Sequence, residues 1–336
     1  MRREVEEAPD AVRRLLDRSG ESLASAGRAL AELDPVLIAT VARGSSDHAA
    51  TLLKYAVEIA AGVPVASVGP SVASIYGVTP KLGQAAAIAI SQSGKSPDIV
   101  SMAEAAARGG ALTLALVNDP SSPLAKAVRH SIDICAGPER SVAATKSFVG
   151  SAAAGLALLA HWRGDCDLLA ALETLPDALE RALGCDWSGL AQTLEAAGSV
   201  FVLGRGPAFA IAGEAALKLK ETCGLHAEPF SAAEVMHGPL AILREGFPVL
   251  AFAAEDQAEA GVAEAADALA EKGAAVWATT NQVKAARALP VARAGHPLLD
   301  PLPLAVSFYL MAEGLARRRG LDPDSPPHLK KVTETR

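Results

Sequence analysis

The chain has 336 residues, of which 50% are hydrophobic and only 4% are aromatic, and its formal net charge is -7. This length suffices for two domains of ordinary size, and small aliphatic side chains must build most of the core, which favours helices packed closely on a sheet. An acidic chain is not typical of nucleic-acid-binding proteins, although local amides and hydroxyls can still bind a phosphorylated sugar.

The cysteines and the N-terminus favour a reducing compartment. Neither Cys-x-x-Cys nor zinc-site spacing occurs among the four cysteines, which are Cys135, Cys166, Cys185 and Cys223. The opening residues MRREVEEAPD lack the apolar core of a secretion signal, and no apolar run approaches the roughly 20 residues of a membrane span. We therefore expect a cytoplasmic protein with free thiols and no zinc site.

The first half of the chain alternates short apolar runs with helical patterns. Residues 1–34 predict a helix that Pro35 ends. Strands are predicted at 36–42, 63–68, 85–90, 112–117 and 132–135, and helices at about 48–61, at 97–107 and up to 162. Alternation of this kind is typical of an open parallel sheet with helices on both faces.

The same pattern starts again after residue 190. A strand at 199–203, an Arg-Gly turn and a long helix repeat the order of the first unit, and further strands are predicted at 249–253 and 275–278. We predict an α/β protein with two doubly wound parallel sheets. The predicted divisions are an N-terminal helical segment (1–34), two domains (35–165 and 191–320), a helical linker between them (166–190) and a tail (321–336).

Two serine-rich turns follow predicted strands of the first domain. The candidate residues are Ser45 and Ser46 in the first turn, and Ser91, Gln92, Ser93 and Ser96 in the second. A strand, a Gly/Ser turn and a helix place hydroxyls and N–H groups at the positive end of the helix dipole, where an anion binds. The alternative is an ordinary polar turn.

A charged stretch in the second domain is the strongest candidate for catalysis. Glu214, Lys218 and Glu221 stand at i, i+4 and i+7, which places them on one face of a helix. Two carboxylates beside an ammonium shift one another's pKa, as an acid/base pair requires. His237 follows in a His-Gly-Pro turn. The alternative is a solvated helix face with a surface histidine.

These segments carry a family resemblance. GEAALKLKE…HAEPFSAAEVMHGPLA and Ser91-Gln-Ser-Gly resemble the isomerase module of glutamine–fructose-6-phosphate aminotransferase, a tandem of sugar-isomerase (SIS) domains. The resemblance implies two flavodoxin-like sheets and extends from about residue 36 to 335. The segment from Glu139 to Lys146 is similar to the family's Glu-x-x-Val-Ala-Ser-Thr-Lys, in which a backbone turn at Val142 meets the sugar; here Ala144 replaces the serine.

In the family, the C-terminal tail folds over the sugar and carries a lysine that forms a Schiff base. Alignment of Asp324, Pro326 and Leu329 places that lysine at Lys331, with Lys330 as the alternative one residue away. The family's Pro-Arg-Asn/Gly is replaced here by Pro-Pro-His. The Lys-Val-Thr-x-Thr ending is similar to the deaminase and ketose/aldose-isomerase branch.

The resemblance implies a homodimeric enzyme similar to the type II glucosamine-6-phosphate deaminase, because no glutaminase domain precedes the module and Met1 is not followed by Cys. It would interconvert glucosamine 6-phosphate plus water with fructose 6-phosphate plus ammonia. The implied phosphate and sugar contacts are Ser45, Ser46, Ser91, Gln92, Ser93, Ser96, Glu139, Val142 and Lys330.

The resemblance implies a separate role in the reaction for each catalytic residue. His237, contributed by the neighbouring subunit, opens the ring, and Glu221 moves a proton between C1 and C2. Lys218 stabilises the enolamine, Glu214 orients Lys218 and His237, and Lys331 forms an imine.

Three other functions stay open at this point. The same chemistry run backward would make glucosamine 6-phosphate from free ammonia or from an ammonia-supplying partner. A different phosphosugar, such as galactosamine 6-phosphate, would make the protein another isomerase or a deglycase. A sugar-phosphate sensor is the non-catalytic alternative, but it has no need of Glu221, Lys218 and His237 together.

Overall fold

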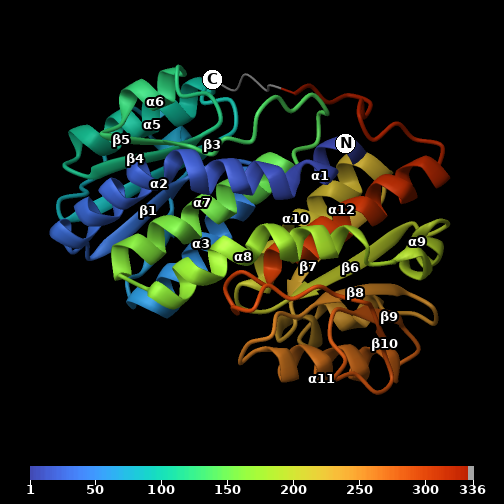
Figure 1. Ribbon diagram of the computed structural model, residues 1–336. Coiled ribbons are helices and arrows are strands. Elements are labelled where there is room, and N and C mark those ends of the chain that lie inside the picture. The colour runs from blue at the N-terminus through green and yellow to red at the C-terminus, as the bar shows by residue number, and fades with distance from the viewer. Residues whose placement is uncertain (332–336) are drawn as a thin grey trace. The chain divides into compact units, whose positions relative to one another are not determined.

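The computed structural model describes residues 1–331 and contains two five-stranded parallel sheets (Figure 1). The first sheet has the order β2-β1-β3-β4-β5, with β1 Leu37–Val41, β2 Val65–Ser67, β3 Ala85–Ser91, β4 Leu112–Val117 and β5 His130–Asp133. The second has the order β10-β9-β8-β6-β7, with β6 Ser199–Gly204, β7 His226–Ser231, β8 Pro248–Phe252, β9 Ala275–Ala278 and β10 Arg287–Ala288. Both therefore have the doubly wound order 2-1-3-4-5. The predicted α/β class with two repeats of one unit is confirmed.

Helices cover both faces of the first sheet. They are α2 Ala8–Leu33, α3 Ser45–Ala61, α4 Ser71–Ser74, α5 Pro97–Arg108, α6 Pro123–Ala127 and α7 Lys146–Arg163. On one face, Ile99, Met102 and Leu124 of α5 and α6 pack against Val41 and Val117 of the strands. Helices α2, α3 and α7 pack together on the other face (Figure 1). Each such fully buried aliphatic side chain stabilises the fold by about 1.5–3 kcal/mol.

The second sheet is covered in the same way. The remaining elements are α1 Arg2–Glu6, α8 Cys166–Leu183, α9 Ser188–Leu194, α10 Ala208–Cys223, η1 Glu234–Met236, η2 Pro239–Ile242, α11 Glu259–Ala270 and α12 Pro301–Arg318. Val262 and Leu269 of α11 pack on Phe201 and Val276 of the sheet, whereas α10 packs on α12 and on β6. No helix within residues 1–331 is both long and apolar enough to cross a membrane.

The chain divides into two compact units, one around each sheet. The unit of the first sheet comprises Ala8–Glu139, Lys146–Pro176 and residues 330–331. The unit of the second sheet comprises Met1–Glu7, Arg140–Thr145 and Asp177–Leu329. The chain thus passes from one unit to the other after Glu7, Glu139, Thr145, Pro176 and Leu329. The ending Val-Thr-Glu-Thr-Arg lies outside the described residues.

Three sequence-based expectations about elements were wrong. The single helix over 1–34 is two helices, α1 and α2, because Pro9 has no N–H to continue a helix and fits only in a first turn. The fifth strand ends at Asp133 because Cys135 has φ 51°, outside the extended region. Strand β7 was not expected, since its sequence HAEPFS has no apolar run; as an edge strand it tolerates Pro229.

Candidate functional site

Residues 91–96, which we call the serine loop, begin at the end of β3, and hydrogen bonds fix the conformation of this loop. The Gly94 N–H donates to Ser91 Oγ at 3.1 Å, and the Gly94 carbonyl accepts from the Leu124 N–H at 3.1 Å. Gly94 has φ 61°, and a Cβ there would lie 2.3 Å from Ser122 Oγ. Only glycine suits this position, because both the left-handed backbone and the lack of space exclude a side chain.

Two helix N-termini meet the same edge of the first sheet. Strands β1 and β3 are parallel neighbours, and α3 begins at Ser45 just after β1, while α5 follows Ser96 just after β3. The first-turn N–H groups of a helix have no intrahelical partner, so this edge favours an anion. The fully buried Asp98 pairs with Arg43 and ties the two turns together. Ser45, Ser46 and Ser96 are half-buried at this edge.

A cavity of about 420 Å³ adjoins the serine loop, a volume within the range of small-molecule sites. We call it the serine-loop cavity; it is lined by Gln92, Ser93, Lys95, Asn118, Asp119, Gly137, Pro138, Glu139 and Lys331. Of the predicted site residues, Gln92, Ser93, Glu139 and Lys331 therefore meet in one place. Ser45, Ser46, Ser91 and Ser96 are not among the lining residues.

Sequence reasoning missed three polar residues of this cavity. Lys95 pairs with Asp119 at 3.2 Å, and the hydroxyl of Ser121 together with Lys95 holds the pKa of Asp119 below its usual value. Asn118 donates from its N–H to the Gln92 carbonyl at 3.3 Å and from Nδ2 to the Gly137 carbonyl at 2.8 Å. A signal existed, since the Asn-Asp-Pro turn follows a predicted strand at its carboxyl end.

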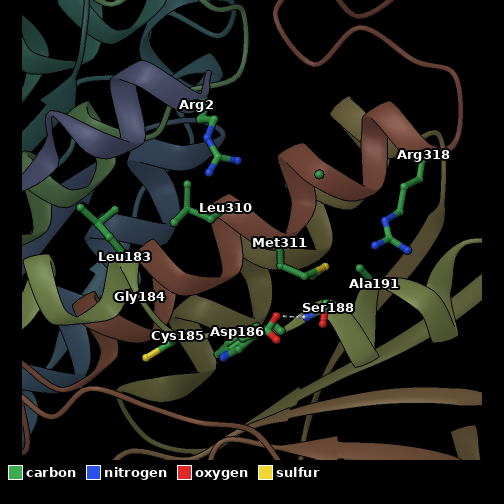
Figure 2. Close-up of a pocket in the computed structure, with 12 residues that line it drawn as sticks. Arg2, Leu183, Gly184, Cys185, Asp186, Ser188, Ala191, Leu310, Met311 and Arg318 are labelled. Carbon is green, nitrogen blue, oxygen red and sulfur yellow. Dashed lines mark hydrogen bonds between the residues drawn. The ribbon is translucent and has the colours of Figure 1, made fainter.

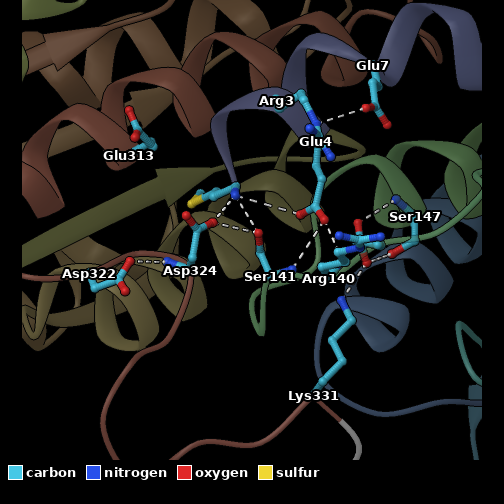
Figure 3. A network of polar contacts seen from close by, with 12 residues as sticks. Arg3, Glu4, Glu7, Arg140, Ser141, Ser147, Glu313, Asp322, Asp324 and Lys331 are labelled. Atoms are coloured by element: carbon cyan, nitrogen blue, oxygen red, sulfur yellow. Dashed lines mark hydrogen bonds and ion pairs between the residues drawn. The ribbon is translucent and has the colours of Figure 1, made fainter.

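Lys331 is held by Glu139 at the wall of the serine-loop cavity. Its Nζ lies 2.8 Å from Glu139 Oε2, and the Glu139 side chain is fully buried. Ser147, at the start of α7, donates its N–H at 3.1 Å and its hydroxyl at 2.6 Å to the same carboxylate. Figure 3 shows Lys331 reaching into this network from the tail. Lys330 is exposed, so of the two candidate lysines only Lys331 enters the cavity.

In the other unit, the predicted charge row of α10 is present. Lys218 is 1% exposed and lies 3.6 Å from Glu214 Oε1, and it forms a close ion pair with Glu221. Tyr309 of α12 donates its hydroxyl to Glu214 Oε1 at 2.8 Å, and Glu214 is also fully buried. Only Glu221, with 23% of its side chain exposed, can meet a substrate directly. We call these three residues the α10 charge row.

His237 and Val142 lie in turns of the same unit. His237 follows η1 and is exposed, so its imidazole is open to solvent. The Val142 N–H donates to the Asp324 carbonyl at 3.2 Å, so the backbone group expected to meet the sugar is already bonded to the tail. The hydroxyl of Ser141 adds a second bond, to Asp324 Oδ1 at 2.7 Å. Two hydrogen bonds therefore hold Asp324 of the tail beside the 141–142 turn, which the family resemblance predicts to contact the sugar.

The corresponding edge of the second sheet has different chemistry. Arg293 occupies it, with Glu259 at 3.6 Å, Asp300 at 3.3 Å and the Ala253 carbonyl at 3.2 Å. Burial raises the pKa of Asp256 in the loop after β8, with Glu259 and Asp300 adding to the effect. This edge carries an internal ion network where the first sheet carries serine-rich turns and two helix N-termini, so the features that favour an anion lie at the first sheet.

A second cavity, of about 340 Å³, lies in the unit of the second sheet between α12 and the residues around Trp187 (Figure 2). Leu183, Leu310 and Met311 form an apolar part, and Arg2 and Arg318 stand at its sides. None of the residues predicted from the sequence lines it. Within residues 1–331, no group of three or more His, Cys, Asp and Glu side chains is placed to hold a metal ion.

Comparison with known proteins gives the family. The SIS domain model matches residues 37–161 and 193–288, so the chain belongs to the SIS domain family. It is 34% identical, over 98% of its length, to glutamine–fructose-6-phosphate aminotransferase (isomerizing) from Gloeobacter violaceus, and it spans 58% of the length of that protein.

Two solved structures show the same fold. A protein from Silicibacter pomeroyi DSS-3, provisionally assigned as a phosphosugar isomerase, is 57% identical with a TM-score of 0.94; the match covers 96% of this chain and 99% of that one. Glucosamine-6-phosphate deaminase from Thermotoga maritima is 19% identical with a TM-score of 0.70, over 97% of this chain and 99% of the other. At that identity the second likeness concerns the fold alone.

The structure predicts that Gly94→Ala destabilises the protein more than Gly62→Ala does. Both glycines have a left-handed backbone, φ 61° and 68°, which costs a non-glycine residue about 1 kcal/mol. A Cβ at Gly62 meets no atom within 4 Å, whereas one at Gly94 clashes with Ser122. Chemical unfolding should show an additional loss of about 1–3 kcal/mol for Gly94→Ala. Equal losses for the two variants would contradict this account of the loop.

Proposed function

We propose that this protein is a phosphosugar isomerase that deaminates glucosamine 6-phosphate, with water, to fructose 6-phosphate and ammonia. We propose further that it acts as a cytoplasmic homodimer and needs no cofactor. The observation that carries the proposal is the α10 charge row, Glu214, Lys218 and Glu221. Burying an ammonium with two carboxylates is costly for a fold, and an exposed carboxylate at the end of such a row suits proton transfer.

The phosphate is assigned to the first sheet. Ser91, Gln92, Ser93 and Ser96 would bind it with their hydroxyls and loop amides, and Ser45 and Ser46 would assist from the start of α3. Support comes from the two helix N-termini at this edge and from the serine-loop cavity beside them. Glu139, Val142 and Lys330 are proposed to contact the sugar or to position the groups that do.

The proposed proton transfers belong to the α10 charge row and His237. Glu221 would move the proton between C1 and C2, and Lys218 would stabilise the negative charge that develops on the enolamine. Glu214 is fully buried and would act by orienting Lys218. His237 would open the ring from the neighbouring subunit, a role for which its exposure leaves it accessible. Lys331 would form an imine with the open ketose.

The reverse reaction is the second candidate. Support for this candidate comes from the similarity, over 98% of this chain, to glutamine–fructose-6-phosphate aminotransferase (isomerizing) from Gloeobacter violaceus. In that direction this protein would make glucosamine 6-phosphate from fructose 6-phosphate and ammonia. The groups and steps would be the same in both directions. Galactosamine 6-phosphate is the alternative substrate, and a sensor without catalysis is disfavoured by the buried charge row.

Incubation of the purified protein with glucosamine 6-phosphate tests the proposal. Ammonia and fructose 6-phosphate should appear in equal amounts, and fructose 6-phosphate with ammonium should yield the amino sugar in the reverse direction. A parallel incubation with galactosamine 6-phosphate identifies the epimer. If neither amino sugar releases ammonia, and fructose 6-phosphate with ammonium gives no product, the protein is not this enzyme.

Glu221→Gln should remove catalysis while leaving binding intact. The substitution removes the group that would accept the C1 or C2 proton, and a positioned general base contributes about 10²- to 10⁴-fold. We expect kcat to fall by that factor and the dissociation constant for fructose 6-phosphate, measured by calorimetry, to change less than about threefold. Glu271→Gln, at an exposed glutamate of the same unit, is the matched control. A rate close to that of the unaltered protein would exclude Glu221 as the proton carrier.

Ser93→Ala should weaken binding of phosphorylated ligands. A hydrogen bond to a charged group contributes about 1.5–3 kcal/mol, so affinity for fructose 6-phosphate should fall at least about tenfold. Titration calorimetry with fructose 6-phosphate and with inorganic phosphate measures the change. Ser22→Ala, at an exposed position of α2, is the control. Unchanged affinity for both ligands would show that the phosphate does not bind at the serine loop.

A further inference from the structure

The buried carboxylate of Glu139 gathers three donors. Ser147 donates its N–H to Oε1 and its hydroxyl to Oε2, and Lys331 Nζ reaches Oε2 at 2.8 Å (Figure 3). Helix α7 begins at Lys146, so the carboxylate also lies at the positive end of an 18-residue helix dipole. Each of these features favours the ionised carboxylate and fixes its orientation. Lys331, by contrast, belongs to the tail and has no helix or strand to position it.

The ion pair and the imine need different forms of the same amine. An ion pair with Glu139 uses the ammonium, whereas attack on a ketose carbonyl needs the neutral amine. The ammonium must first give up a proton, for which the carboxylate in contact with it is an acceptor. The nitrogen then bonds to C2, and the carbonyl oxygen leaves as water with the two hydrogens of the amine. The Glu139–Lys331 contact must therefore break or transfer its proton before the imine forms.

We propose that Glu139, held by Ser147, is the positioning residue for Lys331. It docks the lysine at the wall of the serine-loop cavity in its charged form and releases it to a ketose phosphate that enters the cavity. The inference rests on the proposed imine chemistry. It adds that, before substrate binds, Lys331 is paired with Glu139. Without Glu139, Lys331 would lose the ion pair that docks it at the cavity wall.

Charged groups on the neighbouring elements include Lys95 and Asp119, which line the same cavity and pair with each other at 3.2 Å. Lys146 precedes Ser147 and is buried at the start of α7, and Arg14 of α2 binds the carbonyls of Cys135 and Ala136 just before Glu139 in the chain. Locating the adduct in the sequence therefore distinguishes Lys331 from Lys95 and Lys146.

The test is reductive trapping on the full-length protein. The protein is mixed with fructose 6-phosphate and cyanoborohydride at a series of pH values, and the modified lysine is located by peptide mass spectrometry. We expect the adduct on Lys331 and not on Lys330. In Glu139→Gln, which removes the charge and leaves a single side-chain oxygen to accept from Ser147, the adduct yield should fall several-fold across the pH series because the ion pair that docks Lys331 is lost. In Glu139→Ala, the yield should fall about tenfold because docking is lost.

Glu104→Gln, at an exposed glutamate of α5 in the same unit, is the matched control and should leave the profile unchanged. Should Glu139→Ala fail to fold, the profile of Glu139→Gln decides alone. An identical profile for Glu139→Gln and the unaltered protein overturns the proposal, as does an adduct on Lys330 or none at all. Ammonia release from glucosamine 6-phosphate without an adduct would support the proposed function and contradict this inference. An adduct on Lys331 whose yield falls in Glu139→Gln, without ammonia release, would support this inference and contradict the proposed function.

Discussion

The parallel pairing of β1 with β3 is the constraint on which the candidate phosphate site depends. Val41 stands opposite Ala89 in this pair, so both strands end at the same edge of the sheet. Each is followed by a short turn and a helix, and the two helix dipoles therefore act on the same point. The contact between Arg43 and the buried Asp98 then fixes one turn relative to the other. This geometry, and not the number of serines, makes the edge suitable for an anion.

The two repeats show how one topology carries different chemistry. Both sheets have the strand order 2-1-3-4-5, yet the first has the serine loop at its switch point and the second has Arg293 with Glu259 and Asp300. Arg293, a partly buried arginine, links carboxylates and carbonyls of neighbouring loops and so holds this edge of the second sheet together. The proposed contribution of the second repeat to catalysis depends instead on α10, where Tyr309 bonds Glu214 and Lys218 pairs with Glu214 and Glu221.

The tail links features that the sequence presents far apart. Asp324 accepts hydrogen bonds from the Ser141 hydroxyl and, through its carbonyl, from the Val142 N–H. A few residues later Lys331 meets Glu139. Residues 139–142 therefore provide the contacts both to Asp324 and to Lys331 of the tail. Such contacts order a chain end that has neither helix nor strand, because the hydrogen bonds and the ion pair offset the conformational entropy that the tail loses.

The sequence by itself determined the α/β class, the two repeats, most strand positions and the helical face shared by Glu214, Lys218 and Glu221, because these depend on periodicity and local turn chemistry. It did not determine edge strand β7, whose pattern is polar, nor the break at Glu7 between α1 and α2. Only the tertiary structure selected Lys331 over Lys330 for the cavity and brought Lys95, Asn118 and Asp119 beside Ser93. Those outcomes depend on which loops meet at a sheet edge and on the path of the tail. Contacts between residues so far apart in the sequence produce no periodic pattern from which they could be predicted.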